Sequence, residues 1–437
     1  MNSRELAIVA VQRVKATDAY LNIVVDSLLD EYPLADERDA SLATELSYGT
    51  VRRQRFLDAA IAQVSARGLD TLEDAVLATL RVGAYQLFFT RIPKHAAVDA
   101  TVETLKDKQL GRASGFVNAI LRKLSAMEPS DVVLPGDALA QLALKESHPE
   151  WLVRRWVRHF GQARTEAMLA ANNSPPPVTL RVNTTKATRD DVLKAFSDMG
   201  VPAKATLTSP VGITLDRPGK LDGLYGFAEG LWQVQDEAAQ LVGIFASVSA
   251  GAQVADLCAA PGGKTCHLLE TCTVTASDLR KNKLPKIVAE AERLGLSSRL
   301  TVQAADASVP LPGTFGEFDA VFVDAPCSGL GTLRRHPELR YKRLEEDMGR
   351  LAKLQRSILA IAHTHVKPGG LLVYSVCTTE PEEGADQVEM FLRTHPDFTA
   401  EPPPSKLGLP LWQGHLRTLP GPEGHDGFFA ARLRRMY

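Results

Sequence analysis

The sequence predicts a multidomain protein with an all-α N-terminal domain, a small α+β middle domain and a C-terminal α/β domain of the Rossmann-like type. Three observations lead to this prediction. Apolar residues recur at helical spacing through roughly the first 126 positions, a proline-rich break with short alternating stretches follows, and strands alternate with helices from Val254 onward. A chain of 437 residues is also too long for one compact core, so two or three domains are expected.

The N-terminal region, 1–127, is expected to be a helical domain. One amphipathic stripe consists of Leu6, Val9, Ala10, Arg13 and Val14. Further helical stretches are predicted at 39–55, 72–89 and 98–124, and Pro93 breaks the pattern between the last two.

The middle region, 138–235, begins after a loose stretch at 127–137 that contains Pro129, Pro135 and Gly136. It is expected to start with a helix at 151–160, capped by the residues just before it. Three consecutive prolines at 175–177 end the helical pattern. A strand at 179–183, a helix at 189–199 and strands near 203–207 and 212–215 then predict a small α+β unit.

The C-terminal region, 236–437, shows the strand and helix alternation of a parallel, doubly wound sheet. The predicted strands are 253–257, 273–277, 300–304, 319–323 and 370–376, with an edge strand near 427–433.

The composition and the N-terminal sequence bear on the partners and the location of the protein. The net charge of −2 neither requires nor excludes a nucleic-acid partner, because local patches decide such binding. No apolar run reaches the roughly 18–20 residues that span a bilayer, and the N-terminus lacks the features of a signal peptide, so we expect a cytoplasmic protein without a membrane partner. The sequence leaves the oligomeric state open, with a monomer as the working expectation.

The five cysteines favour neither a disulfide framework nor a metal site. Their number is odd, and all lie between Cys258 and Cys377. Cys258, Cys266 and Cys272 have neither C-x-x-C spacing nor a nearby histidine pair, so no zinc or other metal is expected. Cys266 and Cys272 are expected to be structural, as is the thiol of Cys258, because a free cysteine is often buried.

A glycine turn after the first predicted strand of the C-terminal domain indicates a ligand pocket. Such glycines let the backbone approach a ligand closely. Asp278 stands at the end of the next strand, where an acidic residue commonly binds ribose hydroxyls, and Asp306 follows the third strand. The turn has neither G-x-G-x-x-G nor P-loop spacing, so a dinucleotide or a nucleoside triphosphate is not favoured. Taken alone, the turn could also be a tight strand-to-helix connection.

Two cysteines at predicted strand ends add a possible nucleophile. Cys327 lies in the segment 321–329, Val-Phe-Val-Asp-Ala-Pro-Cys-Ser-Gly, and Cys377 lies at the end of the strand at 370–376. A thiolate is a strong nucleophile, so the combination suggests an enzyme that holds a nucleoside cofactor and forms a covalent intermediate. Either cysteine could instead be a small buried hydrophobe at a turn.

The segments 256–265, 324–329 and 374–383 resemble the cofactor, Pro-Cys and second-cysteine motifs of S-adenosylmethionine-dependent RNA cytosine-5 methyltransferases. The helical segments 81–87 and 116–122 resemble the NusB RNA-binding fold. This pairing is characteristic of the RsmB (Sun) family, which methylates 16S ribosomal RNA. The resemblance covers nearly the whole chain.

The resemblance implies roles for individual residues. Asp278 would hold the ribose, Asp306 would lie beside the adenine, and Asp324 would face both the cofactor and the target base. Cys377 would attack carbon 6 of the cytosine, and Cys327 would help to release the product. The methionine end of S-adenosylmethionine would be wrapped by Cys258, Ala259, Ala260, Pro261, Gly262, Gly263 and Lys264. The chain departs from the family at Val376, where threonine is usual, and at Gly384, where asparagine is usual.

Basic residues directly after the Pro-Cys motif are candidates for RNA contact. Arg334, Arg335 and Arg340 could contact phosphates that flank a flipped cytosine. A solvated loop and helix face would give the same pattern. The cluster of Arg52, Arg53 and Arg55 in the helical domain is a weaker candidate.

Three other functions are possible. An RNA-binding or elongation factor with a degenerate enzyme domain would have lost an aspartate or a cysteine, yet all are present. A DNA cytosine methyltransferase would carry a target-recognition insert and would not explain Cys377. An amino-group methyltransferase would have an Asn/Asp-Pro-Pro-aromatic strand end, where this chain has Asp324, Ala325, Pro326 and Cys327.

Overall fold

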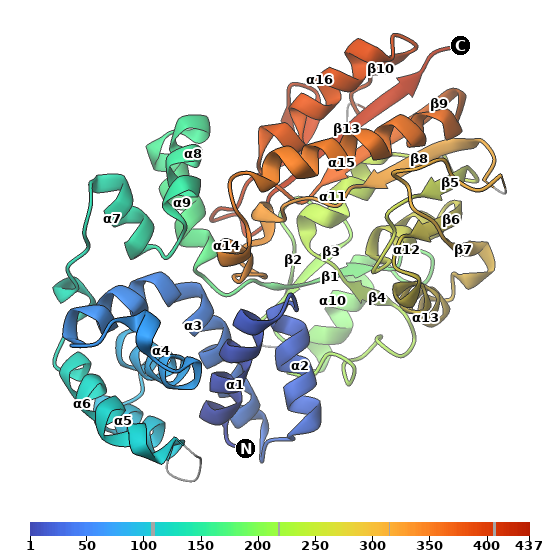
Figure 1. The fold of residues 1–437 in the computed structure, drawn as a ribbon. Coiled ribbons are helices and arrows are strands. Elements are labelled where there is room, and N and C mark those ends of the chain that lie inside the picture. The colour runs from blue at the N-terminus through green and yellow to red at the C-terminus, as the bar shows by residue number, and fades with distance from the viewer. Residues whose placement is uncertain (106–109, 217–218, 314, 405–407) are drawn as a thin grey trace. The chain divides into compact units, whose positions relative to one another are not determined.

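The computed structural model describes residues 1–105, 110–216, 219–313, 315–404 and 408–437, which form two compact units (Figure 1). The first unit is Met1–Ser174 together with Leu333–Lys342, and the second is Pro175–Thr332 together with Arg343–Tyr437. The domain boundaries predicted from the sequence stay predictions. The division at Ser174 places the helices between 138 and 172 with the first unit.

The first unit is built from helices, as predicted. Asn2 and Glu5 form a reciprocal capping box at the start of the first helix, whose buried stripe includes Leu6, Ala10 and Val14. The helix predicted at 151–160 is present, but no side chain caps it, because its N-cap residue is Pro149, whose side chain has no acceptor. The hydroxyl of Ser147 accepts the N–H of Phe56. The helices of this unit are α1 (Ser3–Ala16), α2 (Leu21–Glu31), α3 (Glu37–Val64), α4 (Asp74–Phe89), α5 (Lys94–Glu103), α6 (Ser114–Ser125), α7 (Ala138–Lys145), α8 (Glu150–Phe160), α9 (Gln162–Asn172) and α14 (Leu339–Lys342).

The predicted helical stretch 98–124 is divided between α5 and α6, and its residues 106–109 lie outside the described residues. Within the described part of the chain, no helix is both long and apolar enough to cross a membrane.

Leu333–Lys342, which we call the excursion segment, leaves the second unit in the sequence and packs among the helices of the first. The backbone N–H of Leu21, at the start of α2, donates to Glu338 at 3.1 Å. The hydroxyl of Tyr341 donates to the carbonyl of Val51 in α3 at 3.0 Å, and the ammonium of Lys342 donates to the carbonyl of Thr17 at 2.8 Å. The segment is therefore an integral part of the helical unit.

The second unit contains a small antiparallel sheet with the strand order β2-β3-β1-β4. Its strands are β1 (Val178–Val182), β2 (Ala203–Ala205), β3 (Gly212–Leu215) and β4 (Trp232–Val234), and α10 (Arg189–Asp198) packs on it. Leu180, Phe196 and Trp232 are fully buried in its core. The α+β prediction for this region is confirmed, although β4 was not predicted.

The large sheet of the same unit has the order β11-β12-β13-β9-β8-β5-β6-β7, and β10 pairs with β13. The strands from β9 through β8, β5 and β6 to β7 run parallel, and the strands on the other side of β9 are antiparallel. The bounds are β5 (Gln253–Asp256), β6 (Thr273–Asp278), β7 (Leu300–Ala304), β8 (Phe318–Asp324), β9 (Val366–Val376), β10 (Phe398–Ala400), β11 (Leu411–Trp412), β12 (His415–Thr418) and β13 (Phe428–Arg435).

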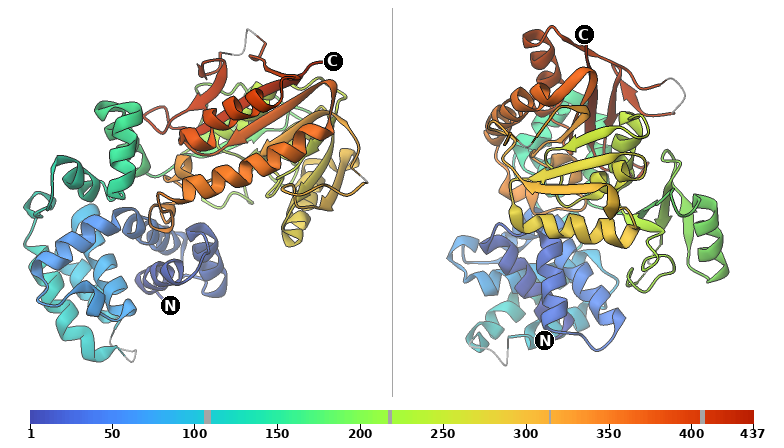
Figure 2. Two further views of the ribbon diagram at one scale, coloured as in Figure 1. Left: turned by 45° about the horizontal axis from the view of Figure 1, so that its top comes forward. Right: turned by 90° about the vertical axis from the view of Figure 1, so that its right-hand side faces the viewer.

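Helices cover both faces of the large sheet. Successive side chains of β8 point to opposite faces and pack against different helices. Ala320 and Phe322 pack in the core with α11 (Glu237–Ala246), α12 (Gly263–Leu269) and α13 (Leu284–Leu294). Val321 and Val323 pack in the opposite core with α15 (Asp347–Ala362) and α16 (Ala385–Thr394). Figure 2 shows α15 lying along one face of the sheet.

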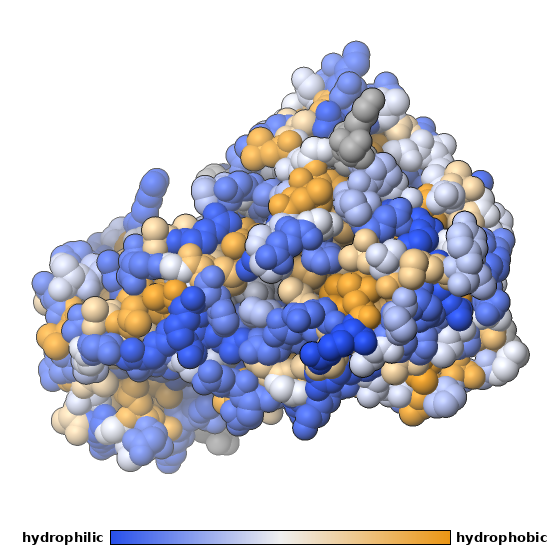
Figure 3. Space-filling model, turned by 90° about the horizontal axis from the view of Figure 1, so that it is seen from above, coloured by the Kyte–Doolittle hydropathy of each residue, from blue (hydrophilic) through white to orange (hydrophobic). Residues whose placement is uncertain are grey.

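The predicted fold class is confirmed, and each of the six strands predicted for the C-terminal region is present. The strands missed there, β10 to β12, are short. The surface in Figure 3 is mostly hydrophilic, with hydrophobic side chains in separate patches.

Candidate active site

The candidate site lies at the carboxyl ends of the parallel strands, where the order of the large sheet reverses. β5 is the turning point, because the chain continues to β6 and β7 on one side and to β8 and β9 on the other. Asp256, Asp278 and Asp324 are the last residues of β5, β6 and β8. Open α/β sheets bind ligands in the crevice at such a switch point.

The glycine turn connects β5 to α12 and is held against β6. Gly262 has φ +108°, in the left-handed region, and a Cβ there would lie 3.2 Å from the Ile287 backbone, so glycine is required. The N–H of Ala259 donates to the carbonyl of Ser277 at 2.9 Å, and the N–H of Ala260 donates to Asp278 at 3.2 Å. The turn and the end of β6 thus form one edge of the site.

Four carboxyl groups give this edge a negative field. The pKa of the Cys258 thiol is held well above its ordinary value, chiefly by burial and then by the negative charges of Asp256, Asp324, Asp278 and Asp306. Burial and the nearby Asp324 also raise the pKa of Asp256 to about 7, although the hydroxyl of Thr265 donates to this carboxyl at 2.7 Å. Such a field favours a ligand that carries positive charge.

Asp306 lies at the outer part of the site. Hydrogen bonds from the hydroxyl and the backbone N–H of Ser308, at 2.6 and 2.9 Å, keep its pKa below the ordinary value. The carboxylate is therefore fixed and charged at neutral pH, as a hydrogen-bond acceptor for a ligand needs to be.

Lys264, the second residue of α12, pairs with Asp324. Its ammonium donates to one carboxylate oxygen at 2.6 Å and lies 5.0 Å from the centre of the Phe428 ring, and the hydroxyl of Ser375 donates to the other oxygen at 2.8 Å. Burial acts to lower the pKa of Lys264, but Asp324 and then Cys377 outweigh it and raise that pKa. Lys264 is thus a largely buried cation that is paired with Asp324 and interacts electrostatically with Cys377.

The two predicted cysteines meet at this site. Their Sγ atoms lie 3.4 Å apart, and both residues are partly exposed. The hydrogen bond to Cys377, burial and the charge of Glu383 hold the pKa of Cys327 well above its ordinary value. Cys327 is therefore a protonated thiol at neutral pH and can donate to the sulfur of Cys377.

Glu383 joins the two cysteine loops and was not predicted as a site residue. Its buried carboxylate accepts the backbone N–H of Ser328 at 2.8 Å and the amide of Gln355 at 3.0 Å. The same amide donates to the carbonyl of Pro326 at 3.0 Å, and the hydroxyls of Ser328 and Thr378 are 2.8 Å apart. The sequence could have indicated Glu383 as a site residue, because it belongs to the second-cysteine motif. Nothing in the sequence indicated Gln355.

The two departures from the family pattern are accommodated locally. The side chain of Val376 is fully buried in the apolar core beneath the site. A Cβ at Gly384 would lie 3.2 Å from the Phe429 ring, and the Gly384 N–H donates to the carbonyl of Glu380 at 3.1 Å. Neither position supplies a group to the reactive sulfurs.

Arg340 is a correction to the predicted RNA contacts. Its side chain is 1% exposed, and the guanidinium donates to the carbonyls of Arg52 and Asn172 at 2.9 and 2.7 Å and to the side chain of Asn173 at 2.7 Å. A guanidinium held in this way inside the first unit cannot reach a phosphate. Arg334 and Arg335 are partly exposed.

The remaining cysteines take no part in the arrangement around Cys377. Cys266 and Cys272 are buried in the core beside α12, and burial raises the pKa of Cys266 to about 12. Among the residues that the structure describes, no three His, Cys, Asp or Glu side chains are grouped so as to hold a metal ion.

Three protein-family models match the chain. The model described as NusB family matches residues 1–126, and the model described as a RsmF/B-like methyltransferase ferredoxin-like domain matches 148–222. The model described as 16S rRNA methyltransferase RsmB/F matches 246–434, which includes both cysteines and all the aspartates of the site.

Similar proteins cover the whole length. The chain is 37% identical to a Pseudomonas putida protein named ribosomal RNA small subunit methyltransferase B, across 99% of this chain and 98% of that one. A protein of the same name from Salmonella paratyphi B is 36% identical with the same coverage. Among solved structures, the crystal structure of PH0851 matches with a TM-score of 0.84 and 26% identity, covering 100% of this chain and 99% of that one.

Proposed function

The chain belongs to the RsmB (Sun) family of 16S ribosomal RNA methyltransferases, and from this premise we propose that it methylates carbon 5 of a cytidine through a covalent bond to Cys377. The observation that carries the proposal is the pair of sulfur atoms 3.4 Å apart, beside the Lys264–Asp324 ion pair. A ribosomal RNA substrate implies that the enzyme acts in the cytoplasm.

S-adenosylmethionine fits the residues at the edge of the site. Its sulfonium is positively charged, and the carboxylates of Asp278, Asp306 and Asp324 give this edge of the site a negative field that favours such a charge. Asp278 accepts one N–H on each oxygen, from Ala260 and Arg280, and retains lone pairs for ribose hydroxyls. When bound, the cofactor supplies an electrophilic methyl group. The turn from Cys258 to Lys264 would hold its methionine end.

The first test of this assignment is Asp278→Ala. Loss of the ribose hydrogen bonds is expected to weaken S-adenosylmethionine binding by about 1–3 kcal/mol, measured by calorimetry. Asp278→Asn keeps one acceptor oxygen and should lose less. Unchanged affinity in an Asp278→Ala protein that melts normally would remove Asp278 from the site.

Cys377 is the proposed nucleophile because its neighbours suit a thiolate. Lys264 is a cation close enough to interact electrostatically with Cys377, and Cys327 is a thiol able to donate to it. Addition of the Cys377 sulfur to carbon 6 of the cytosine forms an S–C bond and makes carbon 5 nucleophilic. After methylation the carbon 5 proton passes to water as the base, the electrons of the C–H bond re-form the double bond between carbons 5 and 6, and the S–C bond breaks to restore the thiolate of Cys377.

Asp324 is the proposed contact to the base. One of its oxygens accepts from Lys264 and the other from Ser375, so the carboxylate is fixed at the strand end with lone pairs left over. A hydrogen bond from the base to this carboxylate would stabilise the charge that develops on the ring when the thiolate adds.

RNA binding is proposed for Arg334 and Arg335 only. The double variant Arg334→Ala/Arg335→Ala should bind 16S RNA more weakly and flatten the salt dependence by about one unit of slope per lost phosphate contact. A matched control is Lys353→Ala/Arg356→Ala, which removes the same charge from two exposed positions of α15. Equal slopes for the two double variants would show that Arg334 and Arg335 only contribute net charge.

A further inference from the structure

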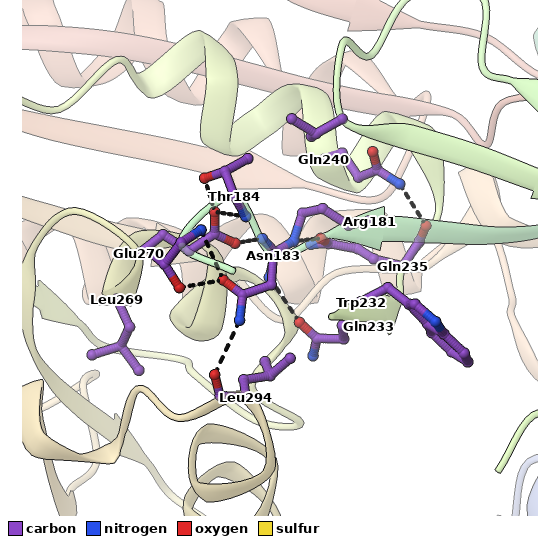
Figure 4. A network of polar contacts seen from close by, with 12 residues as sticks. Arg181, Asn183, Thr184, Trp232, Gln233, Gln235, Gln240, Leu269, Glu270 and Leu294 are labelled. Atoms are coloured by element: carbon purple, nitrogen blue, oxygen red, sulfur yellow. Dashed lines mark hydrogen bonds and ion pairs between the residues drawn. The ribbon is translucent and has the colours of Figure 1, made fainter. Parts of the chain in front are cut away.

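One buried arginine of the small sheet binds the residue that ends the cofactor helix α12 and orients two glutamines that lie near the start of this helix. We propose that Arg181 is a positioning residue that fixes α12, and with it the glycine turn and Lys264, relative to the small sheet (Figure 4). The proposal rests on the proposed function, because it assigns a purpose to the placement of the cofactor turn.

Arg181 lies on β1 and is completely buried. Its guanidinium donates to the amide oxygens of Gln235 at 2.7 Å and Gln233 at 3.0 Å, and it forms an ion pair with Glu270. Each nitrogen of the guanidinium has its own partner, so the orientation of the fork is fixed.

The carboxyl end of α12 is held through Glu270, its C-cap residue. One carboxylate oxygen accepts from Arg181, and the other accepts the backbone N–H and the hydroxyl of Thr184 at 3.0 and 2.5 Å. Both oxygens of Glu270 are therefore hydrogen-bonded to residues 181–184, the segment in which β1 ends. Any shift of this segment relative to α12 would break several charge-assisted hydrogen bonds.

The two glutamines that Arg181 orients lie near the amino end of α12. The amide nitrogen of Gln235 lies 3.6 Å, and that of Gln233 4.0 Å, from the position that a Cβ of Gly263 would occupy. Gly263 is the first residue of α12, and the next residue is Lys264. Arg181 thus orients two side chains that lie near the start of the cofactor helix.

The helix that these contacts hold carries two site residues. Lys264 donates to Asp324 at 2.6 Å, and the hydroxyl of Thr265 donates to Asp256 at 2.7 Å. With only seven residues, α12 has little internal stability and depends on its surroundings. A small displacement of α12 would move the ammonium of Lys264 away from Asp324 and Cys377 together.

Stability alone is a weak reason for such a network. A buried ion pair often adds no more stability than apolar side chains of similar volume would. Arg432 offers a matched control, because it is also a buried arginine of this unit. It lies on β13, donates to the carbonyls of Phe245 and Ala246, and pairs with Glu401 at 3.3 Å.

The test compares Arg181→Met, Arg181→Lys and Arg432→Met in the full-length protein. The measurements are the melting temperature, calorimetric affinity for S-adenosylmethionine, and kcat and KM on 16S RNA. Arg181→Met and Arg432→Met are both expected to melt at lower temperature. Arg181→Met alone should weaken cofactor binding and lower kcat/KM, by about 100-fold, since misplacement by about 1 Å has that effect.

Arg181→Lys separates charge from position. Lysine keeps the ion pair with Glu270 but cannot also orient both glutamines. Compared with Arg181→Met, the Arg181→Lys variant should therefore regain more of the wild-type melting temperature than of the wild-type kcat/KM. Arg432→Met is expected to lower the melting temperature but to keep wild-type cofactor affinity and kcat/KM. If Arg181→Met behaves in the same way, the proposal is overturned. Absence of cofactor binding in the wild-type protein would instead contradict the proposed function.

Discussion

Replacement of Cys377 by alanine is expected to abolish methyl transfer to 16S RNA. Carbon 5 of cytosine is a poor nucleophile until a thiolate adds at carbon 6, and Cys377 is the sulfur that lies near Lys264 with Cys327 as its hydrogen-bonding partner. The measurement is transfer of labelled methyl from S-adenosylmethionine. Cys377→Ala should also form no covalent adduct with RNA containing 5-fluorocytosine, in which fluorine replaces the proton that must leave.

Cys327→Ala is the matched comparison, because it removes the other sulfur of the same pair. Cys377 can still attack, but product release is expected to slow, so a protein–RNA adduct should accumulate on ordinary cytosine. Denaturing gels with RNA and cofactor show such an adduct directly. An adduct trapped by Cys377→Ala but not by Cys327→Ala would reverse the two roles, and full activity in both variants would exclude a cysteine nucleophile.

Asp324→Asn is expected to lower kcat by about 10²–10³-fold, the effect of removing one group that stabilises transition-state charge. The substitution keeps the size of the side chain but removes the charge that pairs with Lys264 at 2.6 Å and that would contact the base. The ammonium of Lys264 would then lose the carboxylate with which it forms an ion pair. Single-turnover methylation, with cofactor affinity measured in parallel, separates the chemical step from binding.

The control for Asp324→Asn is Asp319→Asn. Asp319 lies on the same strand, β8, and also pairs with a lysine, Lys367, at 2.7 Å, but this pair is more exposed and lies at the opposite end of the strand. Asp319→Asn should keep full kcat, because exposed ion pairs contribute little. Equal activity of the two variants would contradict the role of Asp324.

Much of the site could be predicted because short motifs and strand ends are local features. Asp278 and Asp324 end parallel strands, so the sheet itself brings them to one edge; Asp256, which ends β5, was not predicted as a site residue. The short strands β4 and β10 to β12 were missed because so few residues give little periodicity.

The contacts of the arginines could not be predicted, since they depend on partners far away in the sequence. Arg340 resembles a surface residue in a basic run, yet its partners are Arg52, Asn172 and Asn173. Arg181 sits in an alternating strand pattern, and only the fold brings Glu270 to it. Burial of a charged side chain leaves no local signal when its partners are distant.

The excursion segment has a consequence for how the chain is made. The polypeptide leaves the ribosome from its N-terminus, so Met1–Ser174 emerges long before Leu333–Lys342. Until then the carbonyls of Ser147 and Asn172 lack the guanidinium of Arg340, and Leu21 lacks the carboxylate of Glu338. The helical unit is therefore completed only after both the glycine turn and the Pro-Cys loop have been synthesised. The final packing of the first-made helices thus waits for a segment of the chain that is made much later.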